Sequence, residues 1–288
     1  MSELKIAVPN KGRMSEKMLD LLKRSGLGVA DKNERCLCTQ TENEHYSVIF
    51  LRTQDIPKFI SNGTADVGFT GIDVVEENGQ NVDRLLDLDF GYCKMVVALK
   101  DEDPYQTVED LPDNIKVVTS FPNIARKYFE SKGKKAVITE VAGATEITPR
   151  LGLADVIVDI TSSGSTLKMN KLRIIDEILE SSATIIGRPG VKEEKKDEIE
   201  TFIRAIKSAI TAENKKYLMA NIPKKSLPKV KDFLPGLTSP TVVTLLDNDE
   251  EVAIHVVINK NEVYSSVDKL KKLGATGILI LSTDQVIP

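Results

Sequence analysis

The 288-residue sequence contains no tryptophan and only three cysteines, and no run of it approaches the roughly 20 apolar residues of a membrane span. The segment from Met1 to Arg13 lacks the apolar stretch of a signal peptide. Cys36, Cys38 and Cys93 are odd in number, and the first two are too close for an easy disulfide. This pattern favours reduced thiols. We therefore expect a cytoplasmic protein with no membrane partner.

Histidine and excess positive charge are also scarce. Neither His45 nor His255 stands in a spacing typical of zinc ligands. The net charge is −4, so no basic excess is available to hold the phosphates of a nucleic acid, and no nucleic-acid partner is expected. A hydrophobic fraction of 41% and a charged fraction of 28% are typical of a globular protein. The length allows two or three domains.

One stretch suggests a phosphate site. Asp155–Ile160 is an apolar, β-branched run of strand length, and six small or hydroxylated residues follow it before a helix that starts near Leu167. These six are Thr161, Ser162, Ser163, Gly164, Ser165 and Thr166. A strand, a loop and a helix N-terminus in this order can bind an anion through backbone N–H groups and the helix dipole. Asp159 could accept hydrogen bonds from a ribose diol, which together predicts a 5-phosphoribosyl site. The alternative is an ordinary serine-rich turn that caps a helix, and the loop alone favours neither.

The wider pattern around this loop is more specific. It comprises Glu146, Gly152-Leu-Ala154, Ile157-Val-Asp159 and Ser163-Gly164-Ser-Thr166-Leu167. It resembles the signature of the ATP phosphoribosyltransferases, the first enzymes of histidine biosynthesis. The resemblance implies that N1 of the adenine of ATP attacks C1 of 5-phosphoribosyl 1-pyrophosphate and that pyrophosphate leaves. It also implies Mg²⁺ as cofactor, held largely by substrate phosphates and water.

A second loop at a helix N-terminus carries two cations. The strand Leu4–Val8 runs into Lys11-Gly12-Arg13, and an amphipathic helix from Ser15 to Gly26 follows. Lys11 and Arg13 could be solvated, but the glycine between them and their position after a strand favour an anion site. The resembled family has a similar Pro-x-Lys-Gly-Arg segment in its active site.

Further candidates stand at the C-terminal ends of strands, the edge where α/β sheets bind ligands. Arg52 ends the strand Tyr46–Arg52. Thr70 ends the strand Ala65–Thr70, and Gly71 and Asp73 follow it at the start of the next helix. We assign Lys11, Arg13 and Arg52 to pyrophosphate or triphosphate, and Thr70, Gly71 and Asp73 to the nucleotide pocket. Lys94 is a weaker candidate for substrate binding. Glu146 could face the ribose cation or a Mg²⁺-bound water, or it could simply cap a helix.

The same region indicates a bilobal α/β fold. Gly63-x-Ala65-Asp66-x-Gly68, followed by Gly71-x-Asp73, resembles the hinge side of bilobal solute-binding domains. We therefore expect a periplasmic-binding-protein-like (type II) body, with a crossover near Gly91. Residues 1–90 and 183–212 would form the first lobe, and residues 91–182 the second. Helices are expected over Glu146–Leu153 and over Val191–Asn214, the latter with a solvated charged run at residues 193–196.

Residues 213–288 follow the order βαββαβ of a ferredoxin-like domain. In the resembled family's long form such a domain confers inhibition by histidine. We expect the histidine site on small and hydroxylated residues of two turns and on a strand residue beside them: Leu237, Thr238, Ser239, Thr241, Thr276, Gly277 and Asn221. The alternative is a domain that only makes contacts in a homo-oligomer, which could range from a dimer to a hexamer.

Two other functions remain open at this stage. A bilobal solute-binding protein would have the fold without the catalysis. A phosphoribosyltransferase of the common type usually places two acidic residues side by side before its phosphate loop, whereas here Ile160 follows Asp159. ATP and 5-phosphoribosyl 1-pyrophosphate are the expected substrates.

Overall fold

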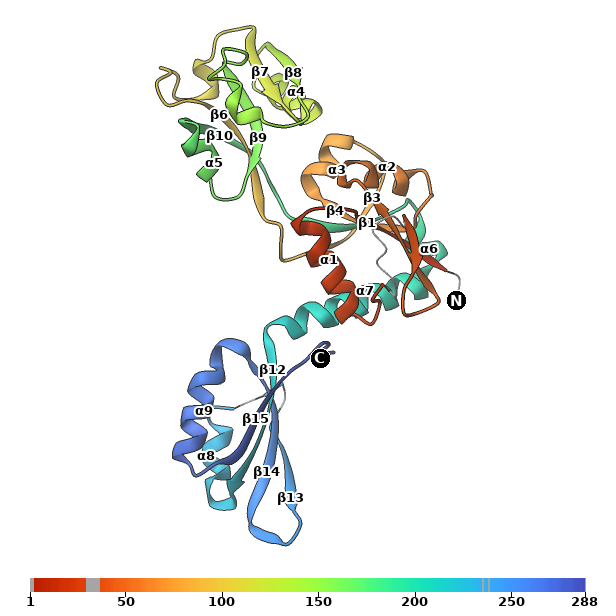
Figure 1. The fold of residues 1–288 in the computed structure, drawn as a ribbon, viewed down its shortest axis with the longest axis vertical. Helices are drawn as coiled ribbons and strands as arrows, with labels where there is room; N and C mark the ends of the chain where they lie inside the picture. Colours follow the sequence, from red (N-terminus) through yellow and green to blue (C-terminus); the bar gives the residue numbers. More distant parts are fainter. Residues whose placement is uncertain (1–2, 30–36, 235, 238, 288) are drawn as a thin grey trace. The chain divides into compact units, whose positions relative to one another are not determined.

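The computed structural model describes residues 3–29, 37–234, 236–237 and 239–287, and it leaves the Arg13 side chain undescribed. The chain divides into two compact units (Figure 1). Residues 1–19 and 29–199 form the first unit, and residues 20–28 and 200–288 form the second. Within the described ranges, none of the helices is both long and apolar enough to cross a membrane.

The first unit contains two sheets, and we name the part built on each a lobe. Lobe I has six strands in the order β2-β3-β1-β4-β11-β5. Their bounds are β1 Leu4–Pro9, β2 Cys38–Gln40, β3 Tyr46–Leu51, β4 Val67–Gly71, β5 Asp83–Asp87 and β11 Ala183–Gly187. Strand β1 runs parallel to β3 and β4, whereas β11 is antiparallel to β4 and β5. The helices of this part of the chain are α1 Arg13–Arg24, α2 Ile56–Ser61, α3 Ile72–Asn78 and α6 Val191–Glu194.

Lobe II has five strands in the order β10-β6-β9-β7-β8. Their bounds are β6 Cys93–Lys100, β7 Ile115–Thr119, β8 Ala136–Glu140, β9 Val156–Thr161 and β10 Leu172–Ser181. Its helices are α4 Pro122–Ser131 and α5 Ser165–Met169, with short 3₁₀ turns at Val108–Asp110 and Thr145–Ile147. Its core buries Met95, Val117, Phe129 and Val158. The chain enters lobe II after β5 and returns as β11, so two crossovers join the lobes, and the predicted bilobal type II fold is confirmed.

Two predicted helices were wrong in extent. Glu146–Leu153 forms only the 3₁₀ turn Thr145–Ile147, because Pro149 cannot continue a helix regularly and Gly152 takes a φ of +70°. Val191–Asn214 is broken at Lys195 into α6 and α7 Lys196–Glu213. The sequence pattern also gave no signal for the three-residue strand β2.

Lys195, the residue at the break, pairs with a buried carboxylate. Asp66 is 6% exposed, and its carboxylate accepts hydrogen bonds from the backbone N–H of Lys5 at 3.0 Å and from Lys195 Nζ at 2.9 Å. Arg188 Nε lies 3.2 Å from its other oxygen. The prediction that residues 193–196 are a solvated face was therefore wrong for Lys195, which anchors the returning chain to β1 and β4.

The second unit carries a four-stranded sheet in the order β13-β14-β12-β15. Its elements are β12 Lys215–Pro223, α8 Leu227–Lys231, β13 Thr241–Leu245, β14 Asn248–Asn259, α9 Val263–Lys272 and β15 Thr276–Ser282. Figure 1 shows α8 and α9 on one side of the sheet. Alternate residues of β12, namely Leu218, Ala220 and Ile222, are buried on that side. The predicted ferredoxin-like arrangement is confirmed, while the residue limits proposed for the three domains stay predictions.

Candidate functional site

A cavity of about 330 Å³ lies in the first unit and is lined by both lobes. This is within the size range of small-molecule sites, about 300–1,000 Å³. Lobe I and the crossovers contribute Met14, Thr53, Gln54, Gly71, Asp73, Val74, Glu77, Asn78, Gly91, Cys93 and Ser182. Lobe II contributes Ser120, Phe121, Ile160 and Ser162. Of the residues predicted from sequence, Gly71, Asp73 and Ser162 line the cavity directly.

The lobe I wall is formed where β4 passes into α3. A side chain at Gly71 would place its Cβ 2.2 Å from Asp73 Oδ1, so only glycine fits beside this carboxylate. Asp73 is 7% exposed, and the Ser181 hydroxyl donates to its Oδ1 at 2.6 Å. The Asp73 N–H in turn donates to Ser181 Oγ at 3.0 Å. Thr70 is fully buried beneath this wall, with its hydroxyl 3.4 Å from the Thr53 carbonyl oxygen.

The start of β6 adds a thiol to the cavity. Burial raises the pKa of Cys93, the nearby Asp73 carboxylate raises it further, and the hydrogen bond with Ser181 lowers it. The net effect is upward, so the thiol stays protonated at neutral pH and forms an uncharged wall. Sequence reasoning missed Cys93, Ser181 and Ser182. Their signal was available in their position, because all three lie at the ends of strands that cross between the lobes.

The lobe II wall contains the predicted phosphate loop. Strand β9 ends at Thr161 and α5 begins at Ser165, so the predicted order of strand, loop and helix is present. Gly164 has a φ of +72°, and its N–H donates to Thr161 Oγ1 at 2.9 Å. The hydroxyls of Ser163 and Ser165 lie 3.0 Å apart. Thr166 lies in the first turn of α5. The loop is thus folded back on its own hydroxyls, with Ser162 facing the cavity.

Two carboxylates lie beside this loop. Burial raises the pKa of Asp159, hydrogen bonds from the Ile160 N–H and the Thr145 hydroxyl lower it, and the charge of Glu146 raises it. The net shift is upward. Asp159 Oδ1 accepts the Ile160 N–H at 2.8 Å. Glu146 is therefore close enough to Asp159 to influence its ionisation, and the two acids predicted from the signature are brought together.

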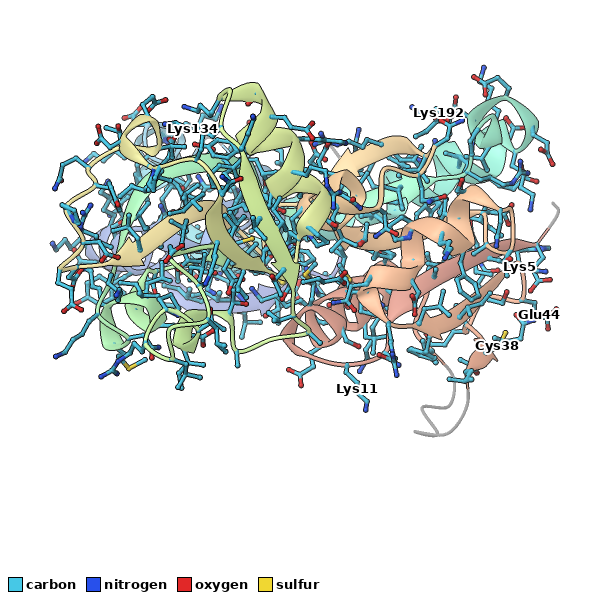
Figure 2. The ribbon with its side chains drawn as sticks, turned by 90° about the horizontal axis from the view of Figure 1, so that it is seen from above. Lys5, Lys11, Cys38, Glu44, Lys134 and Lys192 are labelled. Carbon is cyan, nitrogen blue, oxygen red and sulfur yellow. The ribbon has the colours of Figure 1, made fainter. Side chains whose placement is uncertain are left out.

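The lysines and arginines predicted to bind phosphates are not among the described residues that line the cavity. Lys11 and Arg52 are exposed, and Figure 2 shows the Lys11 side chain pointing away from the ribbon. Lys94 lies 2.8 Å from Glu177 and 3.5 Å from Glu180. The side chain of Arg13 lies outside the described part of the chain. Among the described residues that line the cavity, none is a lysine or arginine. The described residues also contain no group of three or more His, Cys, Asp or Glu that could hold a metal ion.

The predicted histidine residues fall into two groups in the second unit. Asn221 is paired with Thr276 across β12 and β15, and a Cβ at Gly277 would lie 3.6 Å from Asn221 Nδ2. Thr241 is on β13, at the opposite edge of the sheet, where it faces His255 of β14. Leu237 and Ser239 are exposed, and Thr238 lies outside the described residues. The structure thus brings three of the predicted residues together and separates Thr241 from them.

Comparisons with known proteins match one family over nearly the whole chain. The family model described as ATP phosphoribosyltransferase matches residues 52–208, and that of its C-terminal domain matches residues 212–285. An ATP phosphoribosyltransferase of Methanocaldococcus jannaschii is 41% identical over 285 residues, which are 98% of this chain and 99% of the relative. One of Natronomonas pharaonis is 42% identical and covers 99% of this chain and 100% of the relative. Among solved structures, the ATP phosphoribosyl transferase (HisG:HisZ) complex from Thermotoga maritima contains a chain with 30% identity and a TM-score of 0.64, covering 71% of this chain and 96% of that one.

Proposed function

The chain belongs to the ATP phosphoribosyltransferase family, and we propose that the cavity between its lobes is where ATP and 5-phosphoribosyl 1-pyrophosphate react. The reaction is the first step of histidine biosynthesis. One observation supports this location of the active site: Gly71 and Asp73 from lobe I and Ser162 of the phosphate loop from lobe II line the same cavity. A reaction between two substrates needs such a shared cavity, because each lobe can present one of them to the other.

The chemistry requires little proton transfer. N1 of the adenine carries no proton, so its lone pair forms the bond to C1 of the ribose while the bond between C1 and the pyrophosphate oxygen breaks. Positive charge develops on the ribose and negative charge on the leaving group. The protein's contribution is to position both substrates and to stabilise these charges.

We assign the roles by position. The loop Thr161–Thr166 holds the 5-phosphate, with Ser162, Ser163, Gly164, Ser165 and Thr166 as its donors. Asp159 accepts from the ribose hydroxyls, and Glu146 faces the developing ribose cation. Thr70, Gly71 and Asp73 form the nucleotide pocket. Lys94 remains the weakest of the substrate-binding assignments, because two carboxylates already pair with its ammonium.

The charge of the substrates must be balanced from outside the cavity walls. The described lining contains the carboxylates of Asp73 and Glu77 and no cationic side chain. Lys11, Arg13 and Arg52 are the cations that we assign to the phosphates. The family uses a divalent metal, and we propose Mg²⁺, which would neutralise phosphate charge when bound. Glu146 is our candidate for contact with its water ligands, as an alternative to the ribose cation, whereas Asp159 is kept for the ribose hydroxyls.

A pyrophosphate-release assay tests the function. Purified full-length protein with ATP, 5-phosphoribosyl 1-pyrophosphate and Mg²⁺ should release pyrophosphate, and omission of either substrate or addition of EDTA should stop the release. A solute-binding protein would bind a ligand without release. An enzyme of the common type would release pyrophosphate with a free nucleobase in place of ATP. Either of these results would overturn the proposal.

We also propose a function for the second unit, namely the recognition of histidine by its ferredoxin-like domain. The candidate residues are Asn221, Thr276 and Gly277 beside β12 and β15, and Leu237, Thr238, Ser239 and Thr241 at the start of β13 or before it. We also propose a homo-oligomer; the Thermotoga relative was solved as a complex. A cytoplasmic location belongs to the same proposal, because both substrates are polyanionic metabolites that do not cross membranes unaided.

A further inference from the structure

The N-terminus of α4 lacks a cap from its own sequence. Phe121 occupies the N-cap position and makes no side-chain capping hydrogen bond. Pro122, the first helical residue, has no N–H to satisfy. The backbone N–H groups of Asn123 and Ile124 are therefore the first that need an acceptor from outside the helix.

That acceptor comes from the other lobe. The Asn123 N–H lies 3.0 Å from Glu77 Oε1 and 3.1 Å from Oε2, and the Ile124 N–H donates to Oε2 at 2.9 Å. Glu77 is in the last turn of α3 in lobe I, whereas α4 belongs to lobe II. One carboxylate thus caps two N–H groups across the cleft.

The contact is reciprocal. The Asn123 side chain donates from Nδ2 to the backbone carbonyl oxygen of Glu77 at 3.0 Å, and so satisfies a carbonyl at the C-terminal end of α3. A carboxylate at the positive end of α4 also interacts favourably with the helix dipole. Each helix therefore supplies a side chain that the other helix end requires.

The position of this contact links it to the cavity. Glu77 lines the cavity, as do Ser120 and Phe121, the two residues immediately before α4. We propose that Glu77 is a positioning residue that latches the lobes together and holds Ser120 and Phe121 of lobe II opposite Asp73 of lobe I. Because the latch holds two walls of the cavity in their relative position, we expect it to affect substrate binding more than the chemical step.

The test uses the full-length protein with Glu77→Ala, Glu77→Gln and the control Glu76→Gln. Glu76 is the exposed neighbour on the same helix. Loss of charged hydrogen bonds should speed hydrogen exchange at the Asn123 and Ile124 amides by about tenfold or more in Glu77→Ala. Exchange in β7 should not change. Glu77→Gln keeps one acceptor oxygen of two and should lie between Glu77→Ala and the unmodified protein. Glu76→Gln should match the unmodified protein.

The kinetic readout separates positioning from simple stability. In Glu77→Ala the KM values for both substrates should rise by about tenfold while kcat is nearly kept. The reason is that the latch contributes equally to the substrate-bound state and to the transition state. Unchanged amide exchange, or a lower melting temperature with unchanged KM, would overturn the proposal. Only the kinetic readout rests on the proposed function. If the unmodified protein releases no pyrophosphate, that function fails, and the exchange measurement still decides whether the latch exists.

Discussion

The Ser181 hydroxyl donates to the Asp73 carboxylate at 2.6 Å and accepts the Asp73 N–H at 3.0 Å, so two residues 108 positions apart fix each other at the cavity wall. Ser181 is the last residue of β10, where the chain leaves lobe II, and Asp73 is in the first turn of α3 in lobe I. The contact therefore connects a crossover between the lobes to the carboxylate that we assign to the nucleotide. A shift in the backbone of the crossover would move the Asp73 carboxylate.

Ser181→Ala tests this coupling. The substitution removes a donor to a buried carboxylate, a loss of about 1.5–3 kcal/mol where the acceptor is charged. We expect kcat/KM for ATP to fall by about tenfold or more, with a smaller effect on 5-phosphoribosyl 1-pyrophosphate. The measurement is steady-state pyrophosphate release with each substrate varied in turn. Ser131→Ala, at an exposed serine of α4, is the control. An equal loss for both substrates would argue against a specific role of Asp73 at the nucleotide.

Asp159→Asn should separate activity from stability. Burial raises the pKa of this carboxyl, so its contribution to stability is lost as the pH rises through the folded-state pKa, and folding disfavours the ionised form relative to the unfolded chain. Asparagine removes the charge and can still accept the Ile160 N–H. We expect a melting temperature at or above that of the unmodified protein.

The same variant should lose about 1.5–3 kcal/mol of interaction with the ribose hydroxyls. Use of 5-phosphoribosyl 1-pyrophosphate should suffer, while ATP binding measured by calorimetry should barely change. Thr166→Ala should act in the same direction on activity. Normal turnover in Asp159→Asn would remove Asp159 from the site.

Asp66 gives the opposite dependence on pH. Burial raises its pKa, but hydrogen bonds from the Lys5 N–H, Lys195 and Arg188 lower it, and the net shift is downward. Its stabilising contribution is present above the unfolded-state pKa of about 3.9 and is lost as the pH falls through the lower folded-state value. Asp66→Asn removes the buried charge that pairs with Lys195 and Arg188, although Arg188 keeps Glu194 at 2.7 Å, and should cost about 3 kcal/mol in urea unfolding at pH 7. The exposed Asp113→Asn should cost almost nothing, and equal losses in both variants would contradict the assignment.

The sequence predicted those features that depend on local pattern. The β-branched run that became β9, the small-residue loop after it and the βαββαβ order of the second unit are all encoded in neighbouring residues. Features that depend on distant partners could not be predicted. Lys195 looked like part of a solvated run because nothing nearby reveals Asp66. No sequence pattern pointed to Glu77, because the amides it caps are 46 and 47 positions away. Ser181 was missed although its place at a strand end was visible, because its partner Asp73 lies 108 positions away in the sequence.

The cations before α1 provide an electrostatic test. Lys11 is exposed, so Lys11→Ala should change the free energy of unfolding by no more than about 0.5 kcal/mol. The rate of the chemical step should nevertheless fall, because the site must gather several negative charges. Arg13→Ala is expected to behave alike. Single-turnover kinetics with parallel thermal melts measure both effects, and Lys192→Ala, at an exposed lysine of α6, is the control. A large loss of melting temperature with full activity per folded molecule would make these residues structural.

The candidate residues for histidine recognition lie at two separate places in the second unit, so single substitutions can tell which place binds histidine. Asn221, Thr276 and Gly277 lie together at the β12–β15 edge, whereas Thr241 is at the other edge of the sheet. A Cβ at Gly277, whose φ is +55°, would lie 3.6 Å from Asn221 Nδ2, so these two residues are direct neighbours. If the site is at the β12–β15 edge, Asn221→Ala should weaken inhibition by histidine roughly threefold to tenfold, the worth of one hydrogen bond, and keep basal activity. Thr241→Ala should then leave inhibition intact, and the reverse result would move the site to the loop before β13. Inhibition curves on the full-length enzyme decide between them. An enzyme that ignores millimolar histidine altogether would mean that this domain serves only oligomer contacts.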